Sequence, residues 1–296
     1  PTPPAQGHSN TNHQNLPAAQ GFVDAQSLGV PPLSGRKRAV LVGINYLHDK
    51  QLKLGGCIND AKCMKYLLET KFQFKSADIV LLTDDQQNTS FHPTRRNILN
   101  ALGWLTGEAR PGDSLFFHYS GHGSQKRDTD GDEADGMDET IIPMDYRQAG
   151  DIVDDELHKN IASKVPQGTR LTSVMDCCHS GTGLDLPHTY TLSKDGIKQA
   201  VDQRAVKRGK ETKGEVVLFS GCQDNQTSAD TNALSGGART GAMTFSFIQA
   251  VEKHYPNLSY EKLLIEMSRV LRSHHMTQQP SLSSGHGMNV RMKFEV

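Results

Sequence analysis

The chain has 296 residues, a formal net charge of −1 and 35% hydrophobic residues. This length suits one large domain or two small ones with ample apolar surface for a core. The balanced charge argues against nucleic acid or an anionic membrane as the main partner. Five unevenly spaced cysteines argue against a secreted disulfide scaffold. With no signal peptide or apolar run near ~20 residues, we expect a cytoplasmic protein, with the nucleus as the alternative.

The first 35 residues are rich in Pro, Gln, Asn, Gly and Ser, with Asp24 as their only charged residue and Phe22 as their only aromatic one. Such a segment buries too little apolar surface to offset the entropy of ordering it. Two interpretations remain open, a flexible tail or a prosegment that covers a site on the main domain. We therefore expect a prosegment over residues 1–37 and a folded domain over residues 38–296.

Apolar runs bounded by turn residues recur along the chain and predict strands that are covered on both faces. Amphipathic segments lie between them, which predicts a mostly parallel sheet in a three-layer α/β/α sandwich. The expected strands are 39–44, 79–82, 114–119, 171–175 and 215–220. The expected helices are 57–72, 93–109, 154–162, 241–254 and 259–275.

Two later segments are harder to assign. Residues 191–214 carry many lysines and arginines and little apolar content, which favours a solvated basic loop. The closing stretch 288–296 alternates in polarity, as a final strand would.

Two predicted strands end in reactive side chains. The first is followed by His122 between two glycines, and the second by Cys178 and a small-residue turn. Because ligands and chemistry gather beyond the carboxyl ends of strands in an open α/β sheet, the two could meet there. An imidazole beside a thiol raises the thiolate population and makes a nucleophile. Backbone amides of Gly123 and Cys178 are the natural oxyanion donors.

Other thiol chemistries do not fit the spacing. Adjacent Cys177 and Cys178 offer neither the C-x₂₋₄-C pair of a zinc site nor the C-x-x-C of a redox site. Ser180 lies outside a G-x-S-x-G elbow. We assign Cys177 to core packing and Cys178 to attack, and we prefer His122 to His179 as the base.

Four motifs in order, "HYSGHGSQ", "DGDEADGMDETIIPMD", "VMDCCHSGTGLDLP" and "FSGCQDNQTSAD", resemble those of the type I metacaspases. These are cysteine peptidases with a caspase-like fold, and the resemblance runs from about Arg38 to Val296. It implies a nucleophilic Cys178, a catalytic His122, and cleavage of protein substrates after Arg or Lys. The caspase preference for cleavage after Asp is not carried over, because the segment around Cys178 departs from the caspase pattern.

A pocket for a cationic side chain should offer carboxylates, with help from hydroxyl groups. Ser120 and Asp176 each lie two residues before a catalytic residue, so on an extended strand they face the same way as that residue. The resemblance adds Asp60 at the start of the first helix, where the alternative role is a helix cap.

The segment 128–139 holds seven carboxylates and no base, so its charges repel one another unless something neutralises them. Its spacing nearly matches an EF-hand loop, but Glu133 stands where that loop needs glycine, and the flanks do not read as helices. The resemblance implies a Ca²⁺ site, and because Asp185 lies seven residues after Cys178, we expect a bound ion to order the loop after Cys178 and activate the peptidase. Its implied ligands are Asp138, Asp154, Asp155 and Asp185. For Asp154 and Asp155 the alternative is the first turn of a helix.

The function expected from the sequence is a calcium-stimulated cysteine endopeptidase. It would be a monomer that cuts its own basic segment at 194–213. The alternative is a catalytically silent caspase-like scaffold or a calcium-binding regulatory protein. A scaffold would need neither His122 nor Cys178.

Overall fold

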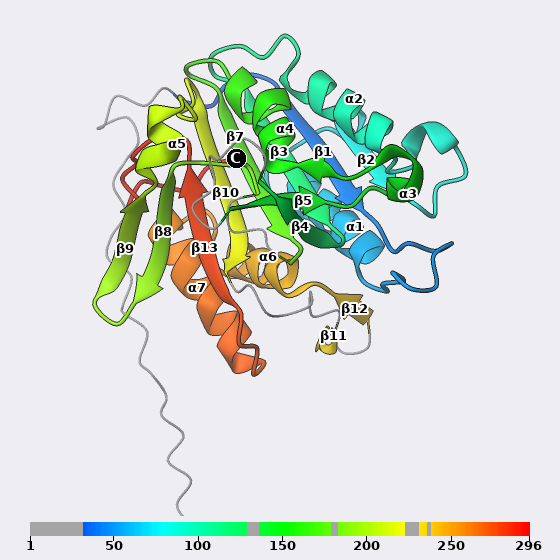
Figure 1. The fold of residues 1–296 in the computed structure, drawn as a ribbon. Coiled ribbons are helices and arrows are strands. Elements are labelled where there is room, and N and C mark those ends of the chain that lie inside the picture. The colour runs from blue at the N-terminus through cyan, green and yellow to red at the C-terminus, as the bar shows by residue number, and fades with distance from the viewer. Residues whose placement is uncertain (1–31, 129–135, 179–182, 223–230, 236–237) are drawn as a thin grey trace, which may run out of the picture.

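A computed structural model describes residues 32–128, 136–178, 183–222, 231–235 and 238–296 (Figure 1). Most of the expected prosegment, residues 1–31, lies outside the described residues. The first strand begins at Lys37, one residue before the expected start of the folded domain.

An eight-stranded sheet forms the centre of the domain, in the order β2-β1-β3-β7-β10-β13-β8-β9. The first five strands in this order are parallel, and the last three join antiparallel. The parallel strands are β1 (Lys37–Gly43), β2 (Ile79–Thr83), β3 (Ser114–Ser120), β7 (Arg170–Asp176) and β10 (Glu215–Cys222). The antiparallel strands are β13 (Gln279–Ser284), β8 (His188–Ser193) and β9 (Gly196–Val201). All five predicted strands are present.

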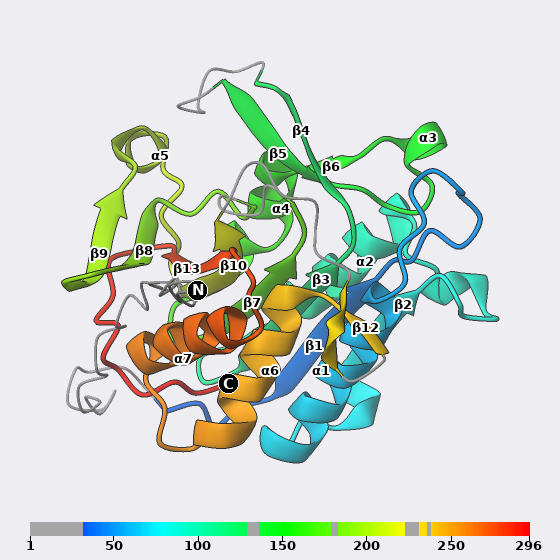
Figure 2. The ribbon, with the colours of Figure 1, turned by 90° about the horizontal axis from the view of Figure 1, so that it is seen from below.

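Helices cover both faces of the sheet, because the central strands are apolar on both sides (Figures 1 and 2). Alternate residues of β1 enter two separate cores: Leu41 packs with the helices of one face and Val42 with those of the other. One face carries α1 (Cys57–Lys71), α6 (Ala242–His254) and α7 (Tyr260–Ser273), and the other carries α2 (Arg95–Thr106) and α4 (Asp154–Asn160). This is the predicted three-layer sandwich.

The basic segment 191–214 is not a solvated loop, as its composition suggested. Strands β8 and β9 form a hairpin that extends the sheet, and the short helix α5 (Gln203–Lys207) follows. Charged residues are tolerated there because β9 is an edge strand with exposed side chains.

The predicted final strand over 288–296 was also wrong. Residues 279–284 form the last strand instead, and they lie inside the sheet between β10 and β8, so the C-terminal segment is not a sheet edge. Residues 288–296 carry only an isolated bridge from Lys293 to Ser259, and Phe294 is buried in the core. Their alternation reflects packing of a non-strand segment.

Smaller elements accompany the central sheet and its helices. A three-stranded sheet contains β4 (Gly123–Arg127), β5 (Met137–Ile141) and β6 (Ile152–Val153), and a second pair contains β11 (Thr231–Ser235) and β12 (Ala238–Thr240). Helix α3 (Tyr146–Ala149) and 3₁₀ turns at Ser76–Asp78, Thr89–Phe91 and Ala162–Lys164 complete the described elements. Within the described ranges, no helix is long and apolar enough to cross a membrane.

Candidate active site

The candidate catalytic residues follow two neighbouring strands of the sheet. Strands β3 and β7 are parallel partners, and their last residues, Ser120 and Asp176, stand opposite each other. His122 and Cys178 lie two residues beyond these ends. The register therefore brings the two predicted catalytic residues to the same level at the carboxyl edge of the sheet, as the sequence predicted.

The backbone after His122 lies against the backbone of Cys178. A Cβ atom placed on Gly123 would come within 2.1 Å of the carbonyl oxygen of Cys178 and 3.3 Å of the Cβ of Cys177. No side chain fits into this space, so glycine is required for the approach. The glycine that the sequence placed beside His122 thus lets the two strand-end turns meet.

The imidazole of His122 is held through a backbone carbonyl. Its Nε2 lies 2.7 Å from the carbonyl oxygen of Leu52, and a carbonyl can only accept, so Nε2 carries the hydrogen. The other ring nitrogen, Nδ1, is then the acceptor in the neutral ring. In this tautomer Nδ1 is the ring nitrogen that can accept a proton.

Two tyrosines hold the main chain at His122. The Tyr46 hydroxyl accepts the His122 amide hydrogen at 3.0 Å and donates to the Ile142 carbonyl at 2.7 Å. The Tyr119 hydroxyl donates to the His122 carbonyl at 2.7 Å. Tyr46 also packs its ring against the imidazole, with centroids 4.9 Å apart. Burial raises the pKa of both phenols, so both stay protonated.

The neighbouring candidates separate as the sequence indicated. Cys177 is buried in the core and Cys178 is only half-buried. His179 lies outside the described residues. His118 also sits on β3, but it is fully buried with Nε2 3.0 Å from the Thr244 hydroxyl, and burial lowers its pKa to about 3. His118 is therefore a neutral core residue, and it does not compete with His122.

The three predicted substrate residues converge beside the same strand ends. Ser120 Oγ donates to Asp60 Oδ2 at 2.7 Å. The Gly241 amide also donates to Asp60, and a Cβ on Gly241 would lie 2.3 Å from Asp176 Oδ2. Asp60 is buried inside α1 with its side chain turned to these partners, so it is not the helix cap that its position allowed.

The two carboxyl groups are closely surrounded by donors. Thr240 Oγ1 donates to Asp60 Oδ1 at 2.5 Å, and the Thr244 amide donates to Asp176 Oδ2 at 2.7 Å. Burial and the nearby charge of Asp176 together raise the pKa of Asp60 to about 7. Two acids buried side by side resist ionising together, so the pair attracts a cation.

The four predicted calcium ligands lie in one region, but they do not form a closed cage. Asp154 opens α4, accepting the Asp155 amide at Oδ1 and the Glu139 amide at Oδ2, so its helix-terminal role is present. Asp138 lies on the neighbouring strand β5. Across the described ranges, no three His, Cys, Asp or Glu side chains are grouped so that they could hold a metal ion.

A lysine ammonium bridges the other two predicted ligands. Lys210 Nζ contacts both Asp155 Oδ1 on α4 and Asp185 Oδ2 on the loop after Cys178. The His158 side chain contacts the Leu184 carbonyl at 3.0 Å and so ties this loop to α4. Two carboxylates from separate elements thus contact one ammonium group, and the same two carboxylates suit a bound metal cation.

The sequence did not reveal every residue of the site. Tyr46 follows β1 as Cys178 follows β7, so its position after a strand was the available signal. No sequence signal marks the Leu52 carbonyl, because every residue type has a backbone carbonyl group. Thr240, Gly241 and Lys210 reach the site only through the tertiary fold.

Comparisons with known proteins agree with this arrangement. Residues 37–187 match the family model described as metacaspase, peptidase C14 domain. The chain is 48% identical over 240 residues to metacaspase-2 of Arabidopsis thaliana, covering 80% of this chain and 57% of that protein. It is 40% identical over 325 residues to metacaspase-1 of Mycosarcoma maydis, covering 97% of this chain and 79% of that one.

Solved structures share the fold. Protein GSU0716 from Geobacter sulfurreducens superposes with a TM-score of 0.60 and 25% identity, over 88% of this chain and 98% of that one. Caspase-1 from Spodoptera frugiperda gives a TM-score of 0.52 at 11% identity, over 86% and 87% of the two chains. The second likeness concerns the fold alone, and it matches the predicted caspase-like sheet.

Proposed function

Because this chain belongs to the metacaspase family of C14 cysteine peptidases, we propose that it is an endopeptidase that cleaves after Arg or Lys through Cys178 and His122. The observation that carries the proposal is the shared level of the two strand ends, with a buried acidic pair beside them. Its protein substrates are those that present a cationic side chain before the scissile bond.

The chemistry follows from the tautomer of His122. Its Nδ1 takes the thiol proton, and the thiolate sulfur of Cys178 attacks the scissile carbonyl carbon. Amides of Gly123 and Cys178 stabilise the oxyanion. His122 then passes the proton to the leaving amine, the C–N bond breaks and a thioester remains. Water, deprotonated by His122, attacks the thioester, releasing the carboxylic acid and restoring the thiol.

Specificity for a cation follows from the acidic pair. Asp60 and Asp176 offer negative charge and Ser120 offers a hydroxyl group, which together suit a guanidinium or an ammonium. In the described conformation, Thr240 and Gly241 occupy the oxygens of Asp60. An arriving cationic side chain replaces these donors, so substrate binding requires the segment at Thr240 to move.

We also propose calcium stimulation. Asp138, Asp154, Asp155 and Asp185 are hard oxygen donors, which suit Ca²⁺, and the bridging Lys210 supports the fit of Asp155 and Asp185 to a positive charge. A bound calcium ion would neutralise the carboxylates. Asp185 would then be fixed, and with it the chain segment that follows Cys178.

Self-processing within residues 194–213 remains part of the proposal. The exposed lysines and arginines on β9 and around α5 present the side chains that the pocket selects. We further propose a monomer located in the cytoplasm, or alternatively in the nucleus, with residues 1–37 as a prosegment. Mapping the new N-termini after calcium addition checks the self-processing step.

A peptide assay tests the central proposal. Fluorogenic peptides ending in Arg and in Asp are offered with and without millimolar Ca²⁺ to the protein and to Cys178→Ala. We expect calcium-dependent hydrolysis of the Arg peptide that is absent in the variant. Hydrolysis that survives in Cys178→Ala removes this cysteine as nucleophile, and preference for the Asp peptide removes the specificity argument alone.

A further inference from the structure

The loop that holds His122 is itself fixed from outside the catalytic pair. This loop follows β1. The Asn45 amide donates to Asp84 Oδ1 at 2.9 Å, and the Leu47 amide donates to Asp84 Oδ2 at 2.8 Å. Its far end closes on itself, with the Leu54 amide donating to the Asn45 carbonyl at 2.9 Å. Between these anchors lies the turn 49–52, which presents the Leu52 carbonyl to the imidazole.

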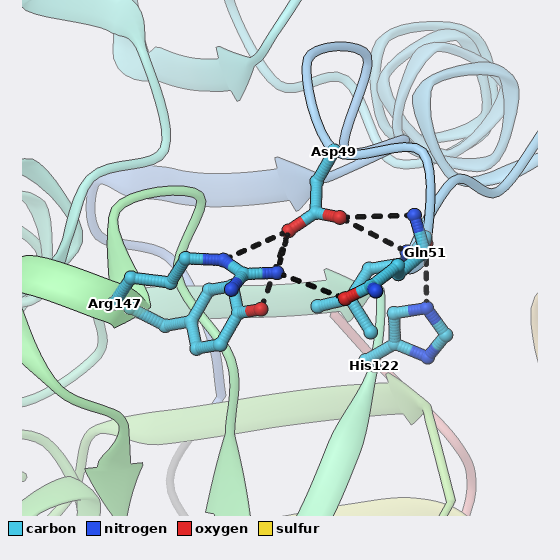
Figure 3. A network of polar contacts seen from close by, with 6 residues as sticks. Asp49, Gln51, His122 and Arg147 are labelled. Atoms are coloured by element: carbon cyan, nitrogen blue, oxygen red, sulfur yellow. Dashed lines mark hydrogen bonds and ion pairs between the residues drawn. The ribbon is translucent and has the colours of Figure 1, made fainter.

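One carboxylate organises that turn. Asp49 Oδ1 accepts the amides of Gln51 at 3.0 Å and Leu52 at 3.4 Å. Asp49 Oδ2 accepts from Arg147 Nη2 at 2.9 Å and Nε at 3.2 Å (Figure 3). The same guanidinium also donates to Gln51 Oε1 at 3.2 Å. Arg147 belongs to α3, so the turn is bound to a different element of the fold.

We propose that Asp49 and Arg147 are positioning residues for His122, acting through the Leu52 carbonyl. Asp49 shapes the turn, Arg147 fixes Asp49, and the carbonyl then holds Nε2–H so that Nδ1 is the basic nitrogen. An exposed ion pair alone contributes little to stability. The Asp49–Arg147 ion pair matters here for geometry, because a small displacement of a catalytic group lowers the reaction rate by a large factor.

The test compares Asp49→Ala, Arg147→Met and Arg147→Lys with Glu69→Gln, which removes a partly exposed carboxylate paired with Lys65 on α1. Rates are normalised to folded enzyme by active-site titration. We expect kcat to fall about tenfold in the first two variants with KM within about twofold, partial rescue in Arg147→Lys, and no change in Glu69→Gln.

The inference rests on the proposed function, and a second measurement separates the two. Nitrogen-15 NMR of the His122 ring in Cys178→Ala reports the tautomer without any activity. Asp49→Ala in that background should raise the Nδ1–H population. An unchanged tautomer together with an unchanged kcat overturns the positioning role, whereas a hydrolytically silent wild type contradicts the proposed function instead.

A second inference stands on the independent contact of Lys210. Its side chain is 14% exposed and lies between Asp155 and Asp185, the latter only 9% exposed. Lys210 follows α5, inside the basic segment proposed for self-processing. The same lysine thus occupies two of the carboxylates proposed for calcium and, by that contact, holds its own segment against the protein.

We propose that Lys210 is an internal cation that competes with calcium, so that calcium binding releases the basic segment. Both cations need the same carboxylate oxygens, so each weakens the other. If Lys210 occupies the site in about nine molecules of ten, the apparent dissociation constant for calcium is raised about tenfold.

Calorimetric titration of Ca²⁺ into Cys178→Ala, where self-cleavage is absent, tests this competition. We expect Lys210→Gln in that background to bind calcium about tenfold more tightly. Lys207→Gln, on α5, should match the parent. Equal or weaker binding by Lys210→Gln overturns the competition. Absence of calcium heat from every variant contradicts the proposed calcium site itself.

Discussion

Ser120 and Asp176 stand opposite each other at the ends of the parallel strands β3 and β7. Each precedes a proposed catalytic residue by two positions, so a single register brings His122 and Cys178 to the same level and the Ser120 hydroxyl and Asp176 carboxylate of the proposed pocket to the same end of the sheet. In the proposed function, catalysis and substrate selection therefore depend on one strand pair. Substitutions at this edge of the sheet should impair catalysis when they alter His122 or Cys178. They should impair substrate selection when they alter Ser120 or Asp176.

Gly123→Ala should abolish most activity while leaving the fold intact. The added Cβ meets the Cys178 carbonyl oxygen at 2.1 Å, and because this neighbour is backbone it cannot move aside as a flexible side chain would. We expect kcat/KM to fall at least about 100-fold, because both the pair and the proposed oxyanion amide shift. Gly103→Ala is the matched control, since its Cβ meets nothing within 4 Å on α2. Equal activity in the two variants would contradict the close approach.

Alkylation should distinguish the cysteines. Cys178 is half-buried and is the proposed partner of His122, whereas Cys63 is more exposed, and partial burial followed by the charges of Asp60 and Glu252 raises the pKa of its thiol. We expect iodoacetamide at neutral pH to modify Cys178 at least about tenfold faster, because the imidazole increases its thiolate fraction. Peptide mass spectrometry gives both rates in one sample. In His122→Ala, the Cys178 rate should fall to that of Cys63, and faster labelling of Cys63 in the native protein would count against the pair.

Asp60→Asn should weaken selection for a positive charge. Loss of a charge-assisted hydrogen bond costs ~1.5–3 kcal/mol, so KM for an Arg peptide should rise about 10- to 100-fold. A peptide with citrulline in place of Arg, neutral but similar in shape, should be affected much less. Glu69→Gln on the same helix serves as control. A similar rise in KM for both peptides would show that Asp60 maintains the shape of the pocket and does not read charge.

The sequence predicted the parallel half of the fold because its strands are continuous apolar runs between amphipathic helices. It failed for residues 191–201, where the few apolar residues of the edge strand β9 form neither a continuous run nor a strict alternation. It also failed for β13, whose residues are mostly small and polar although they are buried. Serine side chains there satisfy one another across the sheet, as in the contact of Ser220 with Ser281 at 3.0 Å. Composition does not reveal such pairing.

For the site, residues with reactive side chains could be read from the chain, and those acting through the backbone could not. His122 and Cys178 follow strands and stand out chemically. Leu52 acts by its carbonyl and Gly241 by its amide, and neither has a side-chain signature. Lys210 was one basic residue among many, and only the fold places it against Asp155 and Asp185.

The raised pKa of Asp60 gives the protein a pH-dependent stability that one substitution should remove. The folded protein holds this proton up to about pH 7, whereas the unfolded chain releases it near 3.8, the ordinary pKa of an aspartate side chain. Between these values the folded state binds more protons, so the free energy of unfolding contributed by this group falls as pH rises through 7. Below about pH 4 both states are protonated and the contribution is complete.

Thermal melts at pH 5, 6, 7 and 8 check this linkage in a Cys178→Ala background, where self-digestion cannot interfere. Because asparagine never ionises, the melting temperature of the parent minus that of Asp60→Asn should decrease steadily from pH 5 to pH 7 and then level off. Glu69→Gln, at a partly exposed site on the same helix, should show no such trend. A parent-minus-variant difference that is constant with pH, or that increases, would mean that Asp60 is already ionised at pH 5 and that its neighbours supply enough positive charge to keep it so.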